Sequence, residues 1–503
     1  MSKFFSYLVP IGLLFTLSVS VPARSEEQTS PLAITNVTII SPDLAEPQKN
    51  MAVIINKGQI TAIVETSVMG DFQGEVIDAA GMYLTPGLMD SHAHTTHVPG
   101  FDYAGSPQEA KHPELVTAYH RQQPRSLLYH GVTQVLDPSP TPEWTKFTDG
   151  DIHPDLFRCG VLPNLGAYPQ IPINRAIEAF PHFIMDPDSG YNMKKGLTAD
   201  PTDHTPEAAL KAIKESGAVC AKLYIEDGFG GLAHWPIPTD KLLGDIRRAA
   251  DAHGLVLYAH ANALDMVQIA LRNNIDVLGH GMWNWQWPAE KGPAPLQETI
   301  DTIKYEGKGY IATFGVIDGL KQLTHENPLK DKRLNTVTPA ALVKWYKTED
   351  AQWFKSDLIA GFGPAADAAT AYQAFEGISA RGARVLAYLN EIGHENFVLG
   401  SDYPGSPSYA KQPGLSTLQE MEMMATAGLP LDKILAAATI NGARMIGVDH
   451  IYGTIEVGKK ANLLLLNENP LNSIGAWDTI DAVILGGRAI KRESLAAAQE
   501  NCL

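Results

Sequence analysis

The stretch YLTPGLMDSHAH, at residues 83–94, ends in two histidines that are separated by one residue. The apolar residues before them predict a short strand. In an extended chain residues i and i+2 lie on the same side, so His92 and His94 are expected to share a face on which both could bind one metal ion. Paired histidines are also common on a solvated strand. The metal prediction therefore depends on further ligands from the rest of the chain.

Two stretches resemble signatures of the amidohydrolase superfamily. Residues 86–94 are similar to its PGLIDxHxH motif at the end of the first barrel strand, and residues 431–462 are similar to a second motif near its carboxyl end. In the second stretch Asn462 replaces the aspartate that is common in the family. The resemblance runs from about residue 32 to residue 488. It implies an α/β fold, namely a (β/α)8 TIM barrel with a small β-sandwich domain built from both chain termini.

The pattern along the chain agrees with that architecture. A length of 503 residues with 45% hydrophobic residues allows one barrel and a smaller companion. Short alternating segments at both ends flank a repeat of strand, loop and helix. The barrel strands are expected at residues 87–92, 132–136, 155–162, 218–225, 255–260, 275–279, 310–316 and 396–400. The predicted divisions are a signal peptide at 1–23, a composite β-sandwich domain from 30–82 and 448–492, and a catalytic barrel at 83–447.

Helices and long loops complete this prediction. Helices are expected at residues 240–253 and 263–274, where apolar residues recur at helical spacing. Long loops are expected at 138–203 and 317–382, the second with a helical patch at 365–375. Because barrel sites lie at the C-terminal ends of the strands, these loops are expected to build the pocket.

The first residues predict export. Lys3 precedes an apolar run at 4–21, and a small-x-small cleavage site follows at 21–23. An uncleaved membrane anchor is the alternative, which Pro10 and Gly12 disfavour because they interrupt the run. The mature protein is therefore expected to be periplasmic or secreted, and to have no membrane attachment.

The charge and the cysteines limit partners and cross-links. A formal net charge of -17 argues against nucleic acid and anionic membranes as partners, so a small-molecule substrate is expected. The resemblance also allows a homo-oligomer. Cys159, Cys220 and Cys502 form an odd and widely spaced set, which does not predict a disulfide framework. We interpret Cys159 and Cys220 as buried free thiols, with one bridge between them as the alternative.

Further metal ligands are expected at the ends of later strands. Lys222 lies inside the apolar run VCAKLY at residues 219–224, and a lysine buried in this way is costly unless it is neutralised or paired. His260 and His280 end the fifth and sixth predicted strands. Each histidine alone would more often be a core residue than a ligand. His260 and His280 end predicted strands, as the paired histidines do, and Lys222 lies within another predicted strand. Chance is a poor explanation for this pattern.

A carboxylate completes the predicted site. Asp402 follows the eighth predicted strand in a stretch that resembles the family's xxGTD motif, with Ser401 in place of threonine. The resemblance implies a binuclear centre with His92, His94 and Asp402 on one side, His260 and His280 on the other, and carboxylated Lys222 as the bridge. Zn²⁺ suits these ligands best, and other divalent ions of similar preference remain open. Asp402 would then act as the general base on a metal-activated water.

Three more side chains are candidates for substrate contacts. Tyr224 shares the strand face of Lys222 and could donate to a substrate carboxylate, a role that a tyrosine has in some related dipeptidases. His97 follows the paired histidines closely. Trp283, with Trp285 and Trp287, could line an apolar pocket or pack the loop after His280 against its neighbours.

The function expected from these features is hydrolysis. We predict an exported metal-dependent amidohydrolase that cleaves a C–N amide bond in a small molecule, such as a dipeptide or an N-acyl amino acid. One alternative is another reaction on the same metals: ester or lactone hydrolysis, deamination or decarboxylation. The other is a binding protein without catalytic activity on the same barrel, which the complete ligand set disfavours.

Overall fold

The computed structural model describes residues 30–102, 106–164, 166–169, 181–185, 201–229, 234–285, 294–325 and 327–497. The predicted signal peptide, Trp287 and Cys502 lie outside these residues.

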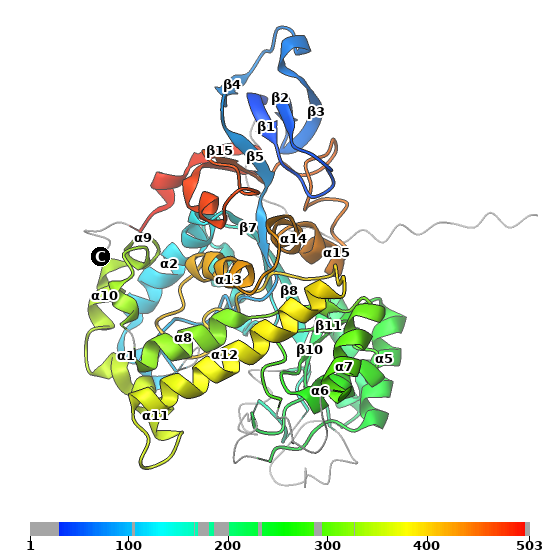
Figure 1. Ribbon diagram of the computed structural model, residues 1–503, viewed down its shortest axis with the longest axis vertical. Coiled ribbons are helices and arrows are strands. Elements are labelled where there is room, and N and C mark those ends of the chain that lie inside the picture. Colours follow the sequence, from blue (N-terminus) through cyan, green and yellow to red (C-terminus); the bar gives the residue numbers. More distant parts are fainter. Residues whose placement is uncertain are drawn as a thin grey trace, which may run out of the picture.

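A curled parallel sheet of seven strands forms the centre of the molecule, in the order β12-β11-β10-β9-β8-β7-β6. Its strands are β6 (Leu88–Asp90), β7 (Val132–Asp137), β8 (Asp155–Val161), β9 (Cys220–Tyr224), β10 (Val256–His260), β11 (Val277–Leu278) and β12 (Gly309–Tyr310). Helices α5, α6 and α7 gather at one side of this sheet and α2 lies at the other (Figure 1). The sequence and spatial orders agree, as expected for strands joined by helical crossovers.

Residues 396–399 lie between the two edge strands of the sheet. The Val398 amide donates to the Tyr310 carbonyl (3.0 Å), and the Ser91 amide donates to the Leu399 carbonyl (2.9 Å). This segment has one isolated bridge, from Phe397 to Tyr310, where a full strand was predicted. It nevertheless brings the chain that follows it beside the end of β6.

The predicted strand 310–316 is wrong beyond Tyr310, because α8 begins at Phe314. Thr313 has φ 45° and breaks the extended run. The buried Glu420 carboxylate accepts the first amides of α8, from Phe314 (2.9 Å) and Gly315 (2.7 Å). Those amides have no partner within the helix, so a carboxylate at this place stabilises the helix start.

Most of the predicted loop 317–382 is helical, because it contains α9, α10 and α11 and parts of α8 and α12.

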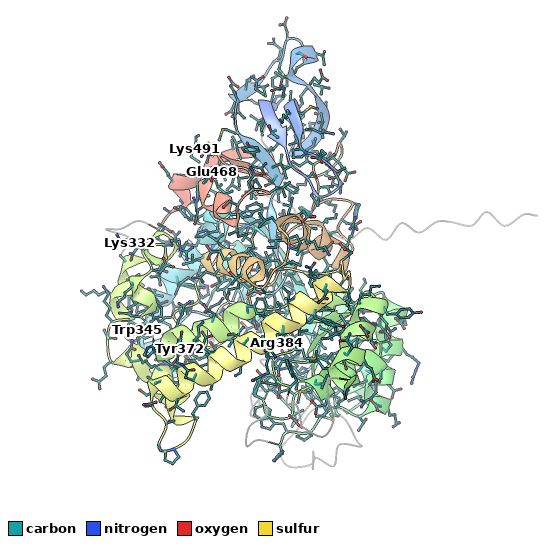
Figure 2. All side chains as sticks on the ribbon, viewed as in Figure 1. Lys332, Trp345, Tyr372, Arg384, Glu468 and Lys491 are labelled. Carbon is teal, nitrogen blue, oxygen red and sulfur yellow. A yellow bond between two sulfur atoms is a disulfide. The ribbon has the colours of Figure 1, made fainter. Side chains whose placement is uncertain are left out.

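The helices of the described residues are α1 (Pro107–Lys111), α2 (Pro113–Tyr129), α4 (Pro206–Glu215), α5 (Asp240–His253), α6 (Leu264–Arg272), α7 (Ala294–Tyr305), α8 (Phe314–Thr324), α9 (Leu334–Val337), α10 (Ala340–Trp345), α11 (Trp353–Ala360), α12 (Ala368–Glu391), α13 (Leu415–Thr426), α14 (Leu431–Ala437) and α15 (Ile440–Met445). The long helix α12 lies along α8, and Tyr372 and Arg384 mark its course (Figure 2). None of the helices within the described residues is long and apolar enough to cross a membrane.

Local sequence signals explain the helix that was predicted best. Helix α5 spans Asp240–His253, as expected. The Thr239 hydroxyl accepts the Leu242 amide at its start, and Gly254 ends it with φ 61°. A hydroxyl cap and a left-handed glycine are the usual start and stop signals.

Both chain ends contribute to a second sheet of eight strands, in the order β15-β14-β13-β5-β1-β2-β3 with β4 paired to β1. Its strands are β1 (Leu32–Ile39), β2 (Gln48–Asn56), β3 (Gln59–Glu65), β4 (Glu75–Asp78), β5 (Tyr83–Pro86), β13 (Leu463–Leu466), β14 (Ile480–Leu485) and β15 (Arg488–Lys491). It lies above the parallel sheet in Figure 1, and Glu468 and Lys491 are on its surface in Figure 2. A sandwich of two layers and the predicted domain boundaries stay predictions.

A disulfide joins Cys159 and Cys220, which are directly paired residues of β8 and β9. The interpretation of these cysteines as free thiols is therefore wrong, and the bridge that was kept as the alternative is present. The sequence spacing could not show that the two segments are neighbouring strands with these residues in register.

We expect loss of this bridge to destabilise the protein. Its ends are 61 residues apart, so it removes many conformations from the unfolded chain. Reduction should lower the free energy of unfolding by roughly 2–4 kcal/mol, measured by urea unfolding of oxidised and reduced protein. Cys159→Ala should resemble the reduced wild type. An unchanged midpoint in both would contradict the prediction.

Candidate metal centre

The paired histidines follow β6 directly, and the buried ring of His92 is held by its surroundings. His92 Nδ1 lies 3.0 Å from the Gly279 carbonyl oxygen and 2.7 Å from the Tyr258 hydroxyl. A carbonyl only accepts hydrogen bonds, so Nδ1 carries the ring proton and Nε2 keeps a free lone pair. A side chain at Gly279 would collide with Tyr258 and with the Lys222 amine, so only glycine fits here. The result is an imidazole with one nitrogen prepared to bind a cation.

Asp402 brings three imidazoles together. Its Oδ1 lies 2.8 Å from His94 Nε2 and 3.4 Å from His92 Nε2, and its Oδ2 lies 3.3 Å from His280 Nδ1. Burial raises the pKa of Asp402, but His92 and His94 outweigh burial and lower this pKa to about 2. The backbone of Asp402 has φ 50°, a conformation that is uncommon for a residue with a side chain. Asp402 is thus an anion in the middle of the histidines.

A buried network on Asp90 supports this arrangement. One Asp90 oxygen accepts the amides of His92 (3.2 Å) and Ser401 (3.0 Å). The other accepts the hydroxyls of Ser401 (2.7 Å) and Thr417 (2.6 Å). Asp90 therefore connects the segment that contains His92 to the segment that contains Ser401 and Asp402.

Lys222 is buried without a hydrogen-bond partner. It is 2% exposed, and no polar atom among the described residues pairs with its amine. The amine lies 4.2 Å from the centre of the Tyr258 ring. Burial lowers the pKa of Lys222 to about 7, against a smaller opposing effect of Asp402. At neutral pH a large fraction of this amine is therefore uncharged and nucleophilic.

His260 and His280 lie beside each other, with ring centroids 4.4 Å apart. Burial, followed by the neighbouring His260, holds the pKa of His280 well below its usual value. Burial also lowers the pKa of His260. Ligand atoms of His92, His280 and Asp402 all lie within 4.8 Å of one another. The structure thus gathers a set of buried nitrogen and oxygen donors that suits a divalent transition metal.

The predicted substrate residues lie around this set. Tyr224 is buried, with its ring centroid 6.0 Å from that of His260. The His97 ring lies 5.6 Å from that of His94, and burial lowers the pKa of His97 to about 3.

Trp283 has the packing role, which is one of the two roles that the sequence left open, and its role in a substrate pocket stays a prediction. Its ring centroid is 5.7 Å from that of His280. The indole N–H of Trp283 donates to the Ala312 carbonyl (3.2 Å). The Trp283 carbonyl accepts a hydrogen bond from Arg381 of α12 (2.7 Å). Trp283 therefore packs the loop after β11 against α12 and contacts a candidate ligand at the same time.

Several residues near the centre were missed. Asp137, at the end of β7, accepts the amide (2.8 Å) and hydroxyl (2.7 Å) of Thr95 behind His94. Its place after a strand was a signal that could have been used. Glu226 contacts His260, and it follows β9 in the same way. The rings of Tyr168 and Phe229 contact His260, and Trp235 stacks on Tyr168. These rings come from loops whose course no sequence pattern predicts.

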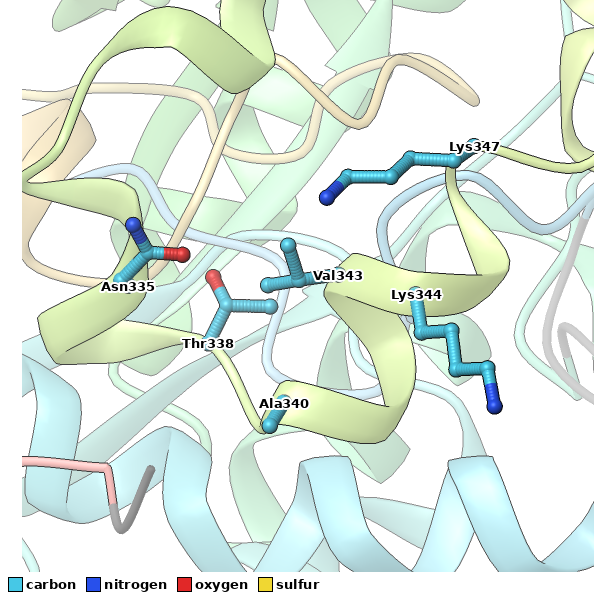
Figure 3. Close-up of a pocket in the computed structure, with 6 residues that line it drawn as sticks. All are labelled: Asn335, Thr338, Ala340, Val343, Lys344 and Lys347. Atoms are coloured by element: carbon cyan, nitrogen blue, oxygen red, sulfur yellow. The ribbon is translucent and has the colours of Figure 1, made fainter. Parts of the chain in front are cut away.

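A surface hollow of about 140 Å³ lies elsewhere and is lined by Asn335, Thr338, Ala340, Val343, Lys344 and Lys347 (Figure 3). The Lys344 ammonium points away from Thr338 in Figure 3. No histidine or carboxylate lines this hollow, so the chemistry of the site belongs to the buried donors around Asp402.

Comparison with known proteins agrees with this geometry. The family model described as "Amidohydrolase family" matches residues 365–490, which include Asp402. This part of the chain is similar to the amidohydrolase family. An imidazolonepropionase of Symbiobacterium thermophilum is 48% identical over 71 residues, 14% of this chain and 16% of that protein. A 5'-deoxyadenosine deaminase of Methanobrevibacter smithii is 39% identical over 59 residues, 12% of this chain and 14% of that protein. The chain spans only 14% to 22% of the length of the curated relatives it matches.

Solved structures resemble this chain over most of its length. A Xaa-Pro dipeptidase with bound methionine has a TM-score of 0.63 at 17% identity, covering 92% of this chain and 100% of that chain. The A. niger ochratoxinase has a TM-score of 0.65 at 19% identity, covering 92% and 96%. At these identities the likeness establishes the fold.

Proposed function

We propose that this protein is a metal-dependent hydrolase that cleaves a C–N amide bond in a small molecule. The observation that carries the proposal is a buried Asp402 carboxylate in contact with three imidazoles, near an unpaired and buried lysine amine. Burying a carboxylate, several imidazoles and an unpaired amine is costly, and bound cations would offset this cost. The arrangement therefore favours a cation-binding site. We further propose that residues 396–400 act as the eighth strand of a closed barrel.

The residues fit two divalent cations, with Zn²⁺ as the best match. His92, His94 and Asp402 would hold one cation, and His260 and His280 the other. Lys222 would bridge them as a carbamate, because its uncharged amine can add to carbon dioxide and lose a proton. When bound, such cations lower the pKa of water and polarise a carbonyl group.

Asp402 would move the proton in the reaction. With a pKa of about 2 it is a carboxylate at neutral pH, so it can take a proton from the attacking water. Protonated Asp402 can then give that proton to the leaving nitrogen, which departs as an amine. The Tyr224 ring lies near His260, with ring centroids 6.0 Å apart. Its hydroxyl would donate a hydrogen bond to a carboxylate of a substrate bound beside His260.

The rings around His260 favour a substrate with an aromatic or large apolar group. Tyr168 stacks on Trp235 with ring centroids 5.2 Å apart, and Phe229 meets both rings edge-on. The Tyr168 ring is 5.0 Å from that of His260, and Phe229 is 44% exposed. A dipeptide or an N-acyl amino acid with an aromatic side chain would therefore fit. One structural neighbour is a Xaa-Pro dipeptidase, which agrees with a dipeptide as the substrate.

A substrate panel tests this proposal. Dipeptides and N-acyl amino acids, each with an aromatic or an alanine side chain, would be assayed for release of the free amine. We expect turnover of aromatic members in the presence of Zn²⁺. Ammonia release from ring amines, or hydrolysis of lactones alone, would favour the alternatives on the same site. Absence of all turnover by metal-loaded protein would favour a binding protein.

Truncation of Trp235 should separate binding from chemistry. We expect Trp235→Ala to raise KM for aromatic substrates about tenfold with a smaller change in kcat, because stacking contributes roughly 1 kcal/mol or more to binding. Tyr305→Ala is the matched control, since Tyr305 is 89% exposed on α7. An equal effect on aromatic and alanine substrates would contradict this role for Trp235.

Export also remains a proposal, supported by the bridge between Cys159 and Cys220. Disulfides persist in oxidising compartments such as the periplasm and are rare in the cytosol. Fractionation of cells that express the full chain, with mass measurement of the mature protein, would test both export and cleavage near Ala23.

A further inference from the structure

Glu226 is a buried carboxylate beside His260. It follows β9 by two residues and is 1% exposed. Its Oε2 lies 3.0 Å from His260 Nε2. Its Oε1 accepts the backbone amides of Gly228 (2.9 Å) and Phe229. The two oxygens therefore serve different partners.

The contact between Glu226 and His260 determines where the ring proton lies. A carboxylate only accepts hydrogen bonds, so the proton between the two atoms is on His260 Nε2. Asn262 Nδ2 is 3.3 Å from the same nitrogen, but an amide N–H gives no hydrogen bond to a protonated nitrogen. Nδ1 is then the nitrogen of His260 that keeps a free lone pair.

We infer that Glu226 is a positioning residue that fixes His260 in the tautomer whose Nδ1 binds a metal ion. The inference rests on the proposed function, because it concerns one of its metal ligands. A carboxylate behind a ligand histidine fixes the orientation of the ring and raises its basicity, and its loss costs roughly 10–100-fold in metal affinity. The His260 ring is already placed against His280, with centroids 4.4 Å apart.

A purely structural role for Glu226, as the acceptor of the two turn amides, makes a different prediction. In Glu226→Gln the amide oxygen can still accept from Gly228 and Phe229. The new NH₂ group then faces His260 Nε2 and donates to it, which forces the ring proton onto Nδ1. The glutamine variant therefore preserves the turn but blocks the metal-binding nitrogen.

The test is metal binding by the full chain, independent of activity. Metal-free wild type, Glu226→Gln and Glu226→Ala would be titrated with Zn²⁺ against a chromophoric chelator in bicarbonate buffer. The visible absorption of the Co²⁺-loaded forms and the thermal stability of the metal-free forms would be recorded. Glu215→Gln is the matched control, because Glu215 is an exposed carboxylate at the end of α4.

We expect both Glu226 variants to bind the more weakly held Zn²⁺ ion roughly 10–100-fold less tightly and to change the Co²⁺ spectrum, with metal-free Glu226→Gln as stable as the wild type. Wild-type affinity in Glu226→Gln would overturn the inference and leave Glu226 as a turn residue. Failure of the wild type itself to bind metal would contradict the proposed function, and the inference with it.

Discussion

Asp402→Asn is expected to reduce kcat/KM by roughly 10³-fold or more, the largest loss among single substitutions at the site. Asparagine has one acceptor oxygen, whereas the carboxylate uses both oxygens on three imidazoles. Its NH₂ group cannot accept from a histidine, and it cannot take a proton from water. The substitution therefore removes a metal ligand and the proposed general base together.

Kinetics on an aromatic N-acyl amino acid, with metal content measured in parallel, would check this prediction. Asp449→Asn is the matched control, because this aspartate follows α15 and takes no part in the contacts of the site. Retention of more than about a tenth of the wild-type kcat/KM would contradict the role of Asp402, since general base catalysis alone contributes about 10²-fold or more.

The metal-free protein should also report on Asp402 through its acid stability. The pKa of Asp402 falls from 3.8 to about 2 in the folded protein. A lowered carboxylate pKa stabilises the folded state above the unfolded pKa, and this contribution disappears as the pH falls through the folded pKa. The contribution of Asp402 should therefore be lost between about pH 4 and pH 2.

Lys222→Ala is the second substitution with a large expected effect: activity should fall about 10³-fold, because the bridge between the two cations is lost. The Lys222 amine has no hydrogen-bond partner among the residues that the structure describes, so the fold should survive. High concentrations of acetate or formate should partly restore activity by placing a carboxylate in the space left by the side chain. Lys304→Ala, on the surface of α7, is the control.

Burial of the Lys222 amine is expected to lower the stability of the metal-free protein, although the proposed activity needs the residue. Burial lowers the pKa of Lys222 in the metal-free protein to about 7, from its ordinary value of 10.5. The unfolded state then binds more protons between these two values, so the stability of the metal-free protein should rise as the pH increases from about 7 to about 10.5. Lys222→Met should flatten this rise and stabilise the metal-free protein by roughly 2–4 kcal/mol at pH 7, although it abolishes activity. Urea unfolding at several pH values would measure both effects.

The sequence could indicate which histidines lie near one another because they come at strand ends. His92, His260 and His280 each come at or just after a short apolar run, and parallel strands place such positions at one edge of the sheet. The structure brings ligand atoms of His92, His280 and Asp402 within 4.8 Å of one another, and the metal-binding role of the predicted set stays a prediction. The same argument applied to Asp137 and Glu226 would have found two further carboxylates near the histidines.

The remaining differences arise where tertiary contacts decide the local structure. The strand at 310–316 failed because Glu420, which is distant in sequence, stabilises the start of α8. The Cys159–Cys220 bridge depends on strand register, which spacing does not reveal. The aromatic rings near His260 lie on loops between strands, where no hydrophobic period constrains the course of the chain.

The most direct test of the account is the metal content per chain of purified mature protein, measured by mass spectrometry of the elements for wild type and Lys222→Ala side by side. Both proteins would be prepared with excess Zn²⁺ and bicarbonate and then dialysed. We expect about two ions per wild-type chain and at most about one in the variant, because Lys222 would bridge the pair. One ion or none in the wild type, with the same content in Lys222→Ala, would contradict the bridged centre.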